Sequence, residues 1–80
     1  MKIINRLSKL KVGQGGSVVK IEAQGLVRRR ILEMGVTLGT EVVVTGTAPL
    51  GDPIEITVKG YHLSLRKEEA ASIWVEAIKK

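Results

Sequence analysis

The fold is decided by residues 54–66, which have the sequence Ile54-Glu55-Ile56-Thr57-Val58-Lys59-Gly60-Tyr61-His62-Leu63-Ser64-Leu65-Arg66. Apolar and polar side chains alternate along both halves of this stretch, and a period of two is typical of strands with one buried face. The central Lys59-Gly60 pair has the length and the glycine of a tight hairpin turn. The stretch therefore predicts an antiparallel hairpin whose apolar face covers a core.

Two segments upstream of the hairpin predict further strands. Residues 41–45 alternate in the same way. Residues 17–22 also alternate, and there we expect Val19 and Ile21 to point inward. The glycine-rich residues 13–16 come just before, and their backbone freedom predicts a turn.

Residues 24–34 form the one segment with the periodicity of a helix. Val27, Ile31 and Met34 recur at intervals of three and four residues, which places them on one helix face. Gly35 follows directly and is expected to end the helix in a left-handed conformation.

The remaining segments complete a mostly β architecture. Residues 66–72 are rich in glutamate and alanine and predict a single helical turn, and residues 73–78 predict the last strand. About five short strands, with one α-helix inserted after the first of them, favour a small closed or half-open barrel, which hides strand edges. We find no repeat and no linker, so residues 1–80 are predicted to form a single domain.

Composition narrows the classes of function. The chain has 80 residues, no cysteine and a net charge of +5. So short a chain has little room for a deep catalytic cleft, and the absence of cysteine suits the cytoplasm. It has no apolar run long enough for a leader or a membrane span, so no direct membrane insertion is expected. The positive charge favours acidic partners.

Catalytic and metal-binding side chains are scarce. His62 is the only histidine, and we expect it on the exposed face of its strand. No catalytic residue and no cofactor is predicted, and the chain is interpreted as a non-enzyme. As a weak candidate metal ligand, His62 could combine only with carboxylates such as Glu55, Glu68, Glu69 or Glu76. A divalent-metal sensor or carrier remains the alternative function.

The predicted helix carries candidate partner-binding residues. Arg28, Arg29 and Arg30 are consecutive, and steps of about 100° spread them around the helix instead of gathering them into one patch. A solvated helix face is the simpler interpretation. A docking role would use these arginines together with Leu26.

A stiff loop and one tryptophan supply further candidates. The loop contains Pro49, Leu50, Gly51, Asp52 and Pro53. Its tip residue, Leu50, has no core to join, so the loop is either a plain turn or a docking element. Trp74 is expected to lie outward and half exposed, where it could anchor a partner. Nucleic acid is not an expected partner, because Tyr61 is expected to point inward and too few aromatic side chains remain to stack on bases.

Three blocks together cover nearly the whole chain. They are Arg30-Ile31-Leu32-Glu33-Met34-Gly35-Val36-Thr37 followed by Gly39-Thr40-Glu41-Val42, then Ala48-Pro49-Leu50-Gly51-Asp52-Pro53-Ile54-Glu55-Ile56, then Gly60-Tyr61-His62-Leu63-Ser64-Leu65-Arg66. In this order and at this spacing they resemble the signatures of the ferrous iron transport protein A (FeoA) family.

The resemblance implies a fold and a partner. The fold would be an SH3-like barrel in the bacterial cytoplasm. The partner would be the membrane protein FeoB, whose GTP-binding domain and pore carry out ferrous iron uptake. The resulting hypothesis is a non-enzymatic accessory or regulatory protein that docks on the cytosolic part of FeoB, which would recruit it to the inner membrane. The sequence leaves open whether the chain acts as a monomer or a homo-oligomer.

Overall fold

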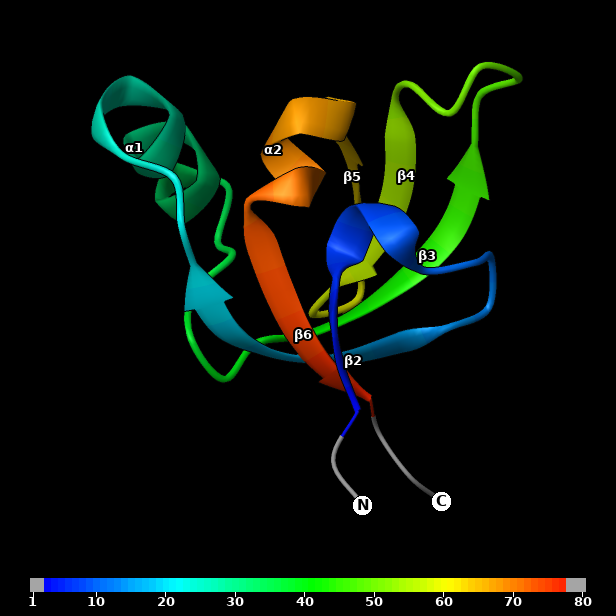
Figure 1. Cartoon of the computed structure of the whole chain (residues 1–80), viewed down its shortest axis with the longest axis horizontal. Coiled ribbons are helices and arrows are strands. Elements are labelled where there is room, and N and C mark those ends of the chain that lie inside the picture. The colour runs from blue at the N-terminus through cyan, green and yellow to red at the C-terminus, as the bar shows by residue number, and fades with distance from the viewer. Residues whose placement is uncertain (1–2, 78–80) are drawn as a thin grey trace.

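A computed structural model describes residues 3–77, which form a six-stranded antiparallel sheet with the order β1-β6-β2-β3-β4-β5 (Figure 1). The strands are β1 (Ile4–Arg6), β2 (Gly15–Ile21), β3 (Glu41–Thr47), β4 (Ile54–Val58), β5 (Tyr61–Leu65) and β6 (Ile73–Ala77). The helices are the 3-10 turn η1 (Leu7–Lys9), α1 (Gly25–Glu33) and α2 (Lys67–Ala71). The predicted mostly β fold is confirmed, with six strands instead of five.

The β4–β5 hairpin forms as the alternation predicts. Its turn places Lys59 and Gly60 at φ 49° and 83°, the positive values that a two-residue hairpin turn needs. Ile56, opposite Leu63 in the register, is fully buried. Most of the core comes from the inward faces of the strands, and residues outside the sheet add Leu7, Ile31, Val36 and Ala70.

The predicted inward position of Val19 is wrong because β2 contains a bulge. Val18 pairs with Val75, and the next pair joins Lys20 to Trp74, so the alternation breaks between them. Val18 is therefore buried, while Val19 is exposed. The inward position of Ile21 is confirmed.

Two of the four residues predicted as a turn belong to a strand. Gly15 and Gly16 open β2, and Gly16 is buried. A side chain on Gly16 would collide with the main-chain oxygen of Glu76 on the neighbouring strand β6. This glycine therefore permits close strand approach, which its sequence context does not distinguish from a turn.

The strand missing from the prediction is β1, which is too short to show a period. It pairs with β6, and Arg6 lies opposite Trp74. The following turn η1 buries Leu7 completely. Because β1 precedes β2, α1 follows the second strand instead of the first. The last residue of the predicted strand 73–78 lies outside the described residues.

Helix α1 lies beside the barrel and buries one side chain. Ile31 is buried as predicted, but Val27 is exposed, so the barrel covers only part of the predicted apolar face of the helix. Gly35 ends the helix with φ 92°, as expected. No helix in residues 3–77 is long and apolar enough to cross a membrane.

The predicted inward position of Tyr61 is also wrong. Tyr61 begins the edge strand β5 and is exposed. Its hydroxyl donates a hydrogen bond of 2.7 Å to the main-chain oxygen of Met34. The side chain therefore reaches sideways to the end of α1 instead of into the core.

Candidate docking site

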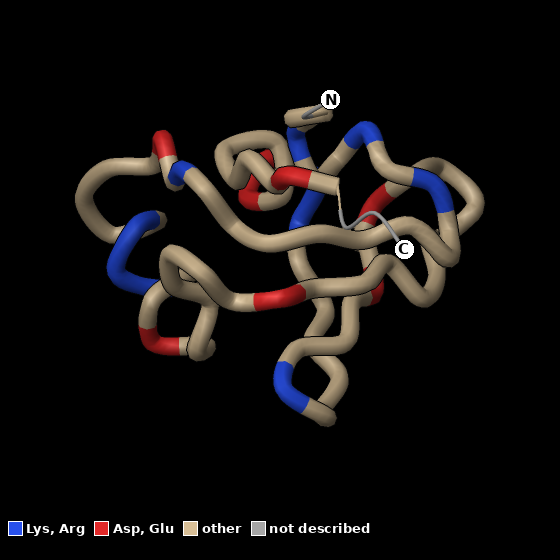
Figure 2. The backbone as a smooth tube through the Cα atoms, turned by 90° about the horizontal axis from the view of Figure 1, so that it is seen from below, with Lys and Arg blue, Asp and Glu red and all other residues tan. Residues whose placement is uncertain are grey.

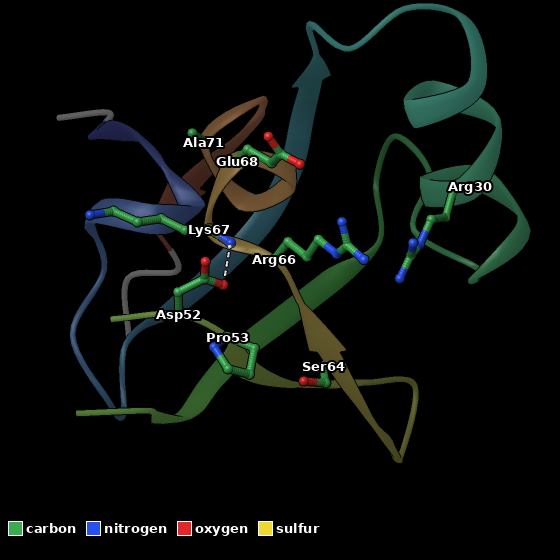
Figure 3. Close-up of a pocket in the computed structure, with 8 residues that line it drawn as sticks. All are labelled: Arg30, Asp52, Pro53, Ser64, Arg66, Lys67, Glu68 and Ala71. Carbon is green, nitrogen blue, oxygen red and sulfur yellow. Dashed lines mark hydrogen bonds between the residues drawn. The ribbon is translucent and has the colours of Figure 1, made fainter. Parts of the chain in front are cut away.

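A surface groove of about 910 Å³ lies between α1, α2 and the loop that joins β3 to β4 (Figure 3). Arg30 of α1 lines one side, and Asp52 and Pro53 of the loop line the other. Ser64 of β5, Arg66 and three residues of α2 complete the wall. The groove thus joins three of the predicted partner-binding residues, Arg30, Asp52 and Pro53, which are far apart in the sequence.

A buried carboxylate fixes the arginine side of this groove. The side chain of Glu69 in α2 is only 4% exposed. One of its oxygens, Oε1, accepts the main-chain N–H of Arg66 at 2.9 Å, which caps the start of α2. The other oxygen, Oε2, accepts the Nε of Arg30 at 3.1 Å. Glu69 therefore ties α1 to α2 and positions both arginines at the groove.

The opposite side is fixed through the loop. The Oδ1 atom of Asp52 accepts the main-chain N–H of Lys67 at 3.1 Å. The loop also closes on itself, because the N–H of Ala48 donates to the main-chain oxygen of Pro53 at 3.1 Å. Beyond this anchored base, Leu50 at the tip is 90% exposed.

The remaining candidates on α1 differ in exposure and contacts. Leu26 is 80% exposed, and Arg29 is exposed next to it. Arg28 donates from Nη1 to the main-chain oxygen of Ile21 at 3.2 Å, which ties the helix to the end of β2. Figure 2 shows the arginines of α1 as one basic segment, while the other lysines and arginines are spread over several sides of the molecule.

Trp74 belongs to a different surface. Its ring lies 4.7 Å from the guanidinium carbon of Arg6, measured to the ring centroid, and its indole N–H donates to the carboxylate of Glu22. It lines a shallow apolar patch with Ile4 and Val19 on the β1-β6-β2 part of the sheet. Trp74 is half-buried, as expected, but it is not part of the groove.

Comparison with known proteins identifies the family. The model of the FeoA domain matches residues 5–77. The chain belongs to the FeoA family. It is 45% identical over 73 residues to the Fe(2+) transport protein A/Fe(2+) transporter FeoB fusion protein of Porphyromonas gingivalis, a match that covers 91% of this chain and 9% of that protein.

Solved FeoA structures have the same fold. A FeoA-like protein from Clostridium acetobutylicum is 40% identical, with a TM-score of 0.88 over 100% of this chain and 93% of that one. The zinc complex of Stenotrophomonas maltophilia FeoA, described as a procaryotic SH3 domain protein, is 27% identical, with a TM-score of 0.70 over 84% of each chain. The expected SH3-like architecture of this FeoA-family member is confirmed.

The weak metal candidate His62 stands apart from other ligands. It is exposed, and its Nδ1 lies 3.3 Å from the hydroxyl oxygen of Thr57 on the facing strand. Within residues 3–77, no three histidine, cysteine, aspartate or glutamate side chains are grouped so that they could hold a metal ion. The alternative of a metal sensor or carrier stays a prediction.

Sequence reasoning missed the residues that complete the groove. The sequence assigns Ser64 to a strand and Arg66 to the junction of that strand with a helical turn, and it names Glu69 only within that turn and as a carboxylate that could join His62. The spacing of Arg66 and Glu69 does contain a signal, because a glutamate three residues after a helix start is typical of a capping contact. That signal predicts where the helix begins. It does not predict that Arg30 pairs with Glu69, because only the tertiary fold brings these two residues together.

Proposed function

We propose that this FeoA-family chain is a non-enzymatic accessory of bacterial ferrous iron uptake that docks on the cytosolic part of FeoB. The observation that supports it is the fusion in Porphyromonas gingivalis, where an Fe(2+) transport protein A unit and FeoB form one polypeptide. A covalent link holds two units at high effective concentration. A binding surface on this chain would supply the corresponding contact with FeoB.

The contact surface we propose combines α1 with the β3–β4 loop. Figure 1 shows these two elements on either side of α2. Each presents a highly exposed leucine, Leu26 on α1 and Leu50 on the loop, and exposed apolar side chains next to charged ones are typical of docking surfaces. A partner that contacts both leucines would also cover the groove between them.

Binding of the 80-residue chain to the soluble GTP-binding domain of FeoB tests the proposal. Titrations are run with and without guanine nucleotide. We expect saturable binding that weakens at least about tenfold in the double variant Leu50→Asp/Arg29→Glu, because an apolar contact and a charge are both lost. Binding that differs between the nucleotide states would favour a regulatory role.

The control is the double variant Val12→Asp/Lys11→Glu, which makes the same change in charge at an exposed apolar and basic pair elsewhere. If both double variants bind as the wild type does, the proposed surface is wrong. If the wild type binds neither the soluble domain nor full-length FeoB, docking itself is wrong.

A further inference from the structure

Two guanidinium groups extend toward each other across the groove (Figure 3). The Nε of Arg30 pairs with Glu69, and its two terminal nitrogens form no ion pair within residues 3–77. Arg66 forms no ion pair within residues 3–77. A guanidinium with free N–H groups binds carboxylates in a planar, often bidentate geometry. We infer that the groove binds an extended acidic segment of a partner protein, with carboxylates held between Arg30 and Arg66.

The size and walls of the groove favour a peptide over a single ion. A volume of about 910 Å³ is at the upper end of the range that holds drug-sized ligands, so several residues of extended chain fit. Pro53 and Ala71 add apolar surface between the charged groups. A small anion would use only the arginines and leave this surface uncovered.

The neighbouring strand edge favours an extended conformation. Strand β5 is the edge of the sheet and pairs only with β4 in the described residues. Because antiparallel pairs alternate, and Tyr61 lies next to the two-residue turn, the main-chain groups of His62 and Ser64 face away from β4. Ser64 lines the groove, so a segment there can pair with unbonded main-chain groups.

The groove also orients its occupant by charge. Asp52 and Glu68 line it together with the two arginines, and the side chain of Lys67 points away from it. Carboxylates are therefore favoured beside Arg30 and Arg66 and disfavoured near Asp52. A segment with acidic residues at one end and neutral residues at the other matches this polarity.

The inference rests on the proposed function for the identity of the partner, but binding of an acidic segment to the groove can be tested without FeoB. The probe is the tetrapeptide acetyl-Glu-Glu-Ala-Ala-amide, titrated into the isotope-labelled 80-residue chain and followed by amide chemical shifts. We expect weak saturable shifts at Ser64, Arg66 and Lys67. The neutral peptide acetyl-Gln-Gln-Ala-Ala-amide is expected to produce none.

The deciding variant is Arg66→Gln, which removes a guanidinium that carries no internal ion pair in the described chain. We expect about tenfold weaker binding of the acidic tetrapeptide. Lys11→Gln removes the same charge outside the groove and is expected to bind as the wild type does. Equal affinity in Arg66→Gln and Lys11→Gln would overturn the inference. Inorganic phosphate that competes as strongly as the peptide at equal ionic strength would also overturn it.

The same variants separate this inference from docking on FeoB. If Arg66→Gln binds FeoB as the wild type does but its affinity for the tetrapeptide falls, the groove recognises acidic segments without contacting the transporter, so FeoB is overturned as the source of the segment while docking stands. If the wild type fails to bind FeoB but its affinity for the tetrapeptide depends on Arg66, docking fails and recognition of acidic segments by the groove stands.

Discussion

The two helices differ in how much of their length is used for packing. Helix α1 has nine residues and buries only Ile31, whereas α2 has five residues and buries Glu69 and Ala70. Helices this short are unstable in isolation and depend on tertiary contacts. The shorter helix is therefore a structural part of the barrel, and the longer one is held mainly at its C-terminal end. Most of the surface of α1 is left available to a partner.

The difference between the two helices depends on the few contacts that hold α1 to the rest of the fold. Ile31 anchors α1 in the core, and Glu69 joins α1 to α2 through Arg30. The Arg28 bond to the main chain of β2 adds a third tie. Removing these contacts one at a time shows whether α1 is a docked element or a loosely attached one.

The largest effect is expected for Ile31→Ala. This side chain is fully buried, so the substitution leaves a cavity and lowers the free energy of unfolding by about 2–5 kcal/mol. Urea denaturation measures the change, and Ile56→Ala in the barrel core is the reference, with an expected loss in the same range. A loss below about 0.5 kcal/mol for Ile31→Ala alone would show that α1 is not anchored by this residue.

A smaller effect is expected for Glu69→Ala. The substitution removes the cap of the Arg66 N–H and the acceptor of the Arg30 Nε, and it lowers the free energy of unfolding by about 1–3 kcal/mol. Glu69→Gln should lose less, because an amide oxygen can still accept the Arg66 N–H. Arg30→Gln should cost at most about 1 kcal/mol, since its side chain is 52% exposed. If Glu69→Ala, Glu69→Gln and Arg30→Gln lower the free energy of unfolding equally, the contact between Glu69 and the Arg66 N–H has no stabilising role of its own.

The sequence predicts the barrel well wherever alternation is unbroken. The faces of β3 and β4 follow directly from the period of two, and Gly35 ends α1 as expected. Prediction fails at Val19, where a bulge shifts the register, and at Val27, whose helix has too few neighbours to bury it. Bulges and partial docking depend on contacts with distant segments, which a local pattern does not contain.

The residues that line the groove show the same limit of prediction from local sequence. Sequence reasoning selected Arg30, Asp52 and Pro53, each because of its local segment, and the fold brings all three to one groove. It did not select Arg66, whose position opposite Arg30 depends on how two helices meet. A local motif predicts what a residue can do, but the partner of that residue across a groove follows only from the tertiary arrangement.

The smallest effect on stability is expected for Leu26→Ser. Leu26 is 80% exposed near the start of α1, so the free energy of unfolding should change by no more than about 0.5 kcal/mol. Urea denaturation checks this, and a loss above about 1 kcal/mol would show that the start of α1 packs as tightly as α2. An unchanged free energy of unfolding would mean that folding does not require an apolar side chain at position 26. The leucine would then be best explained by contact with a partner, which the same variant tests by weaker binding to FeoB.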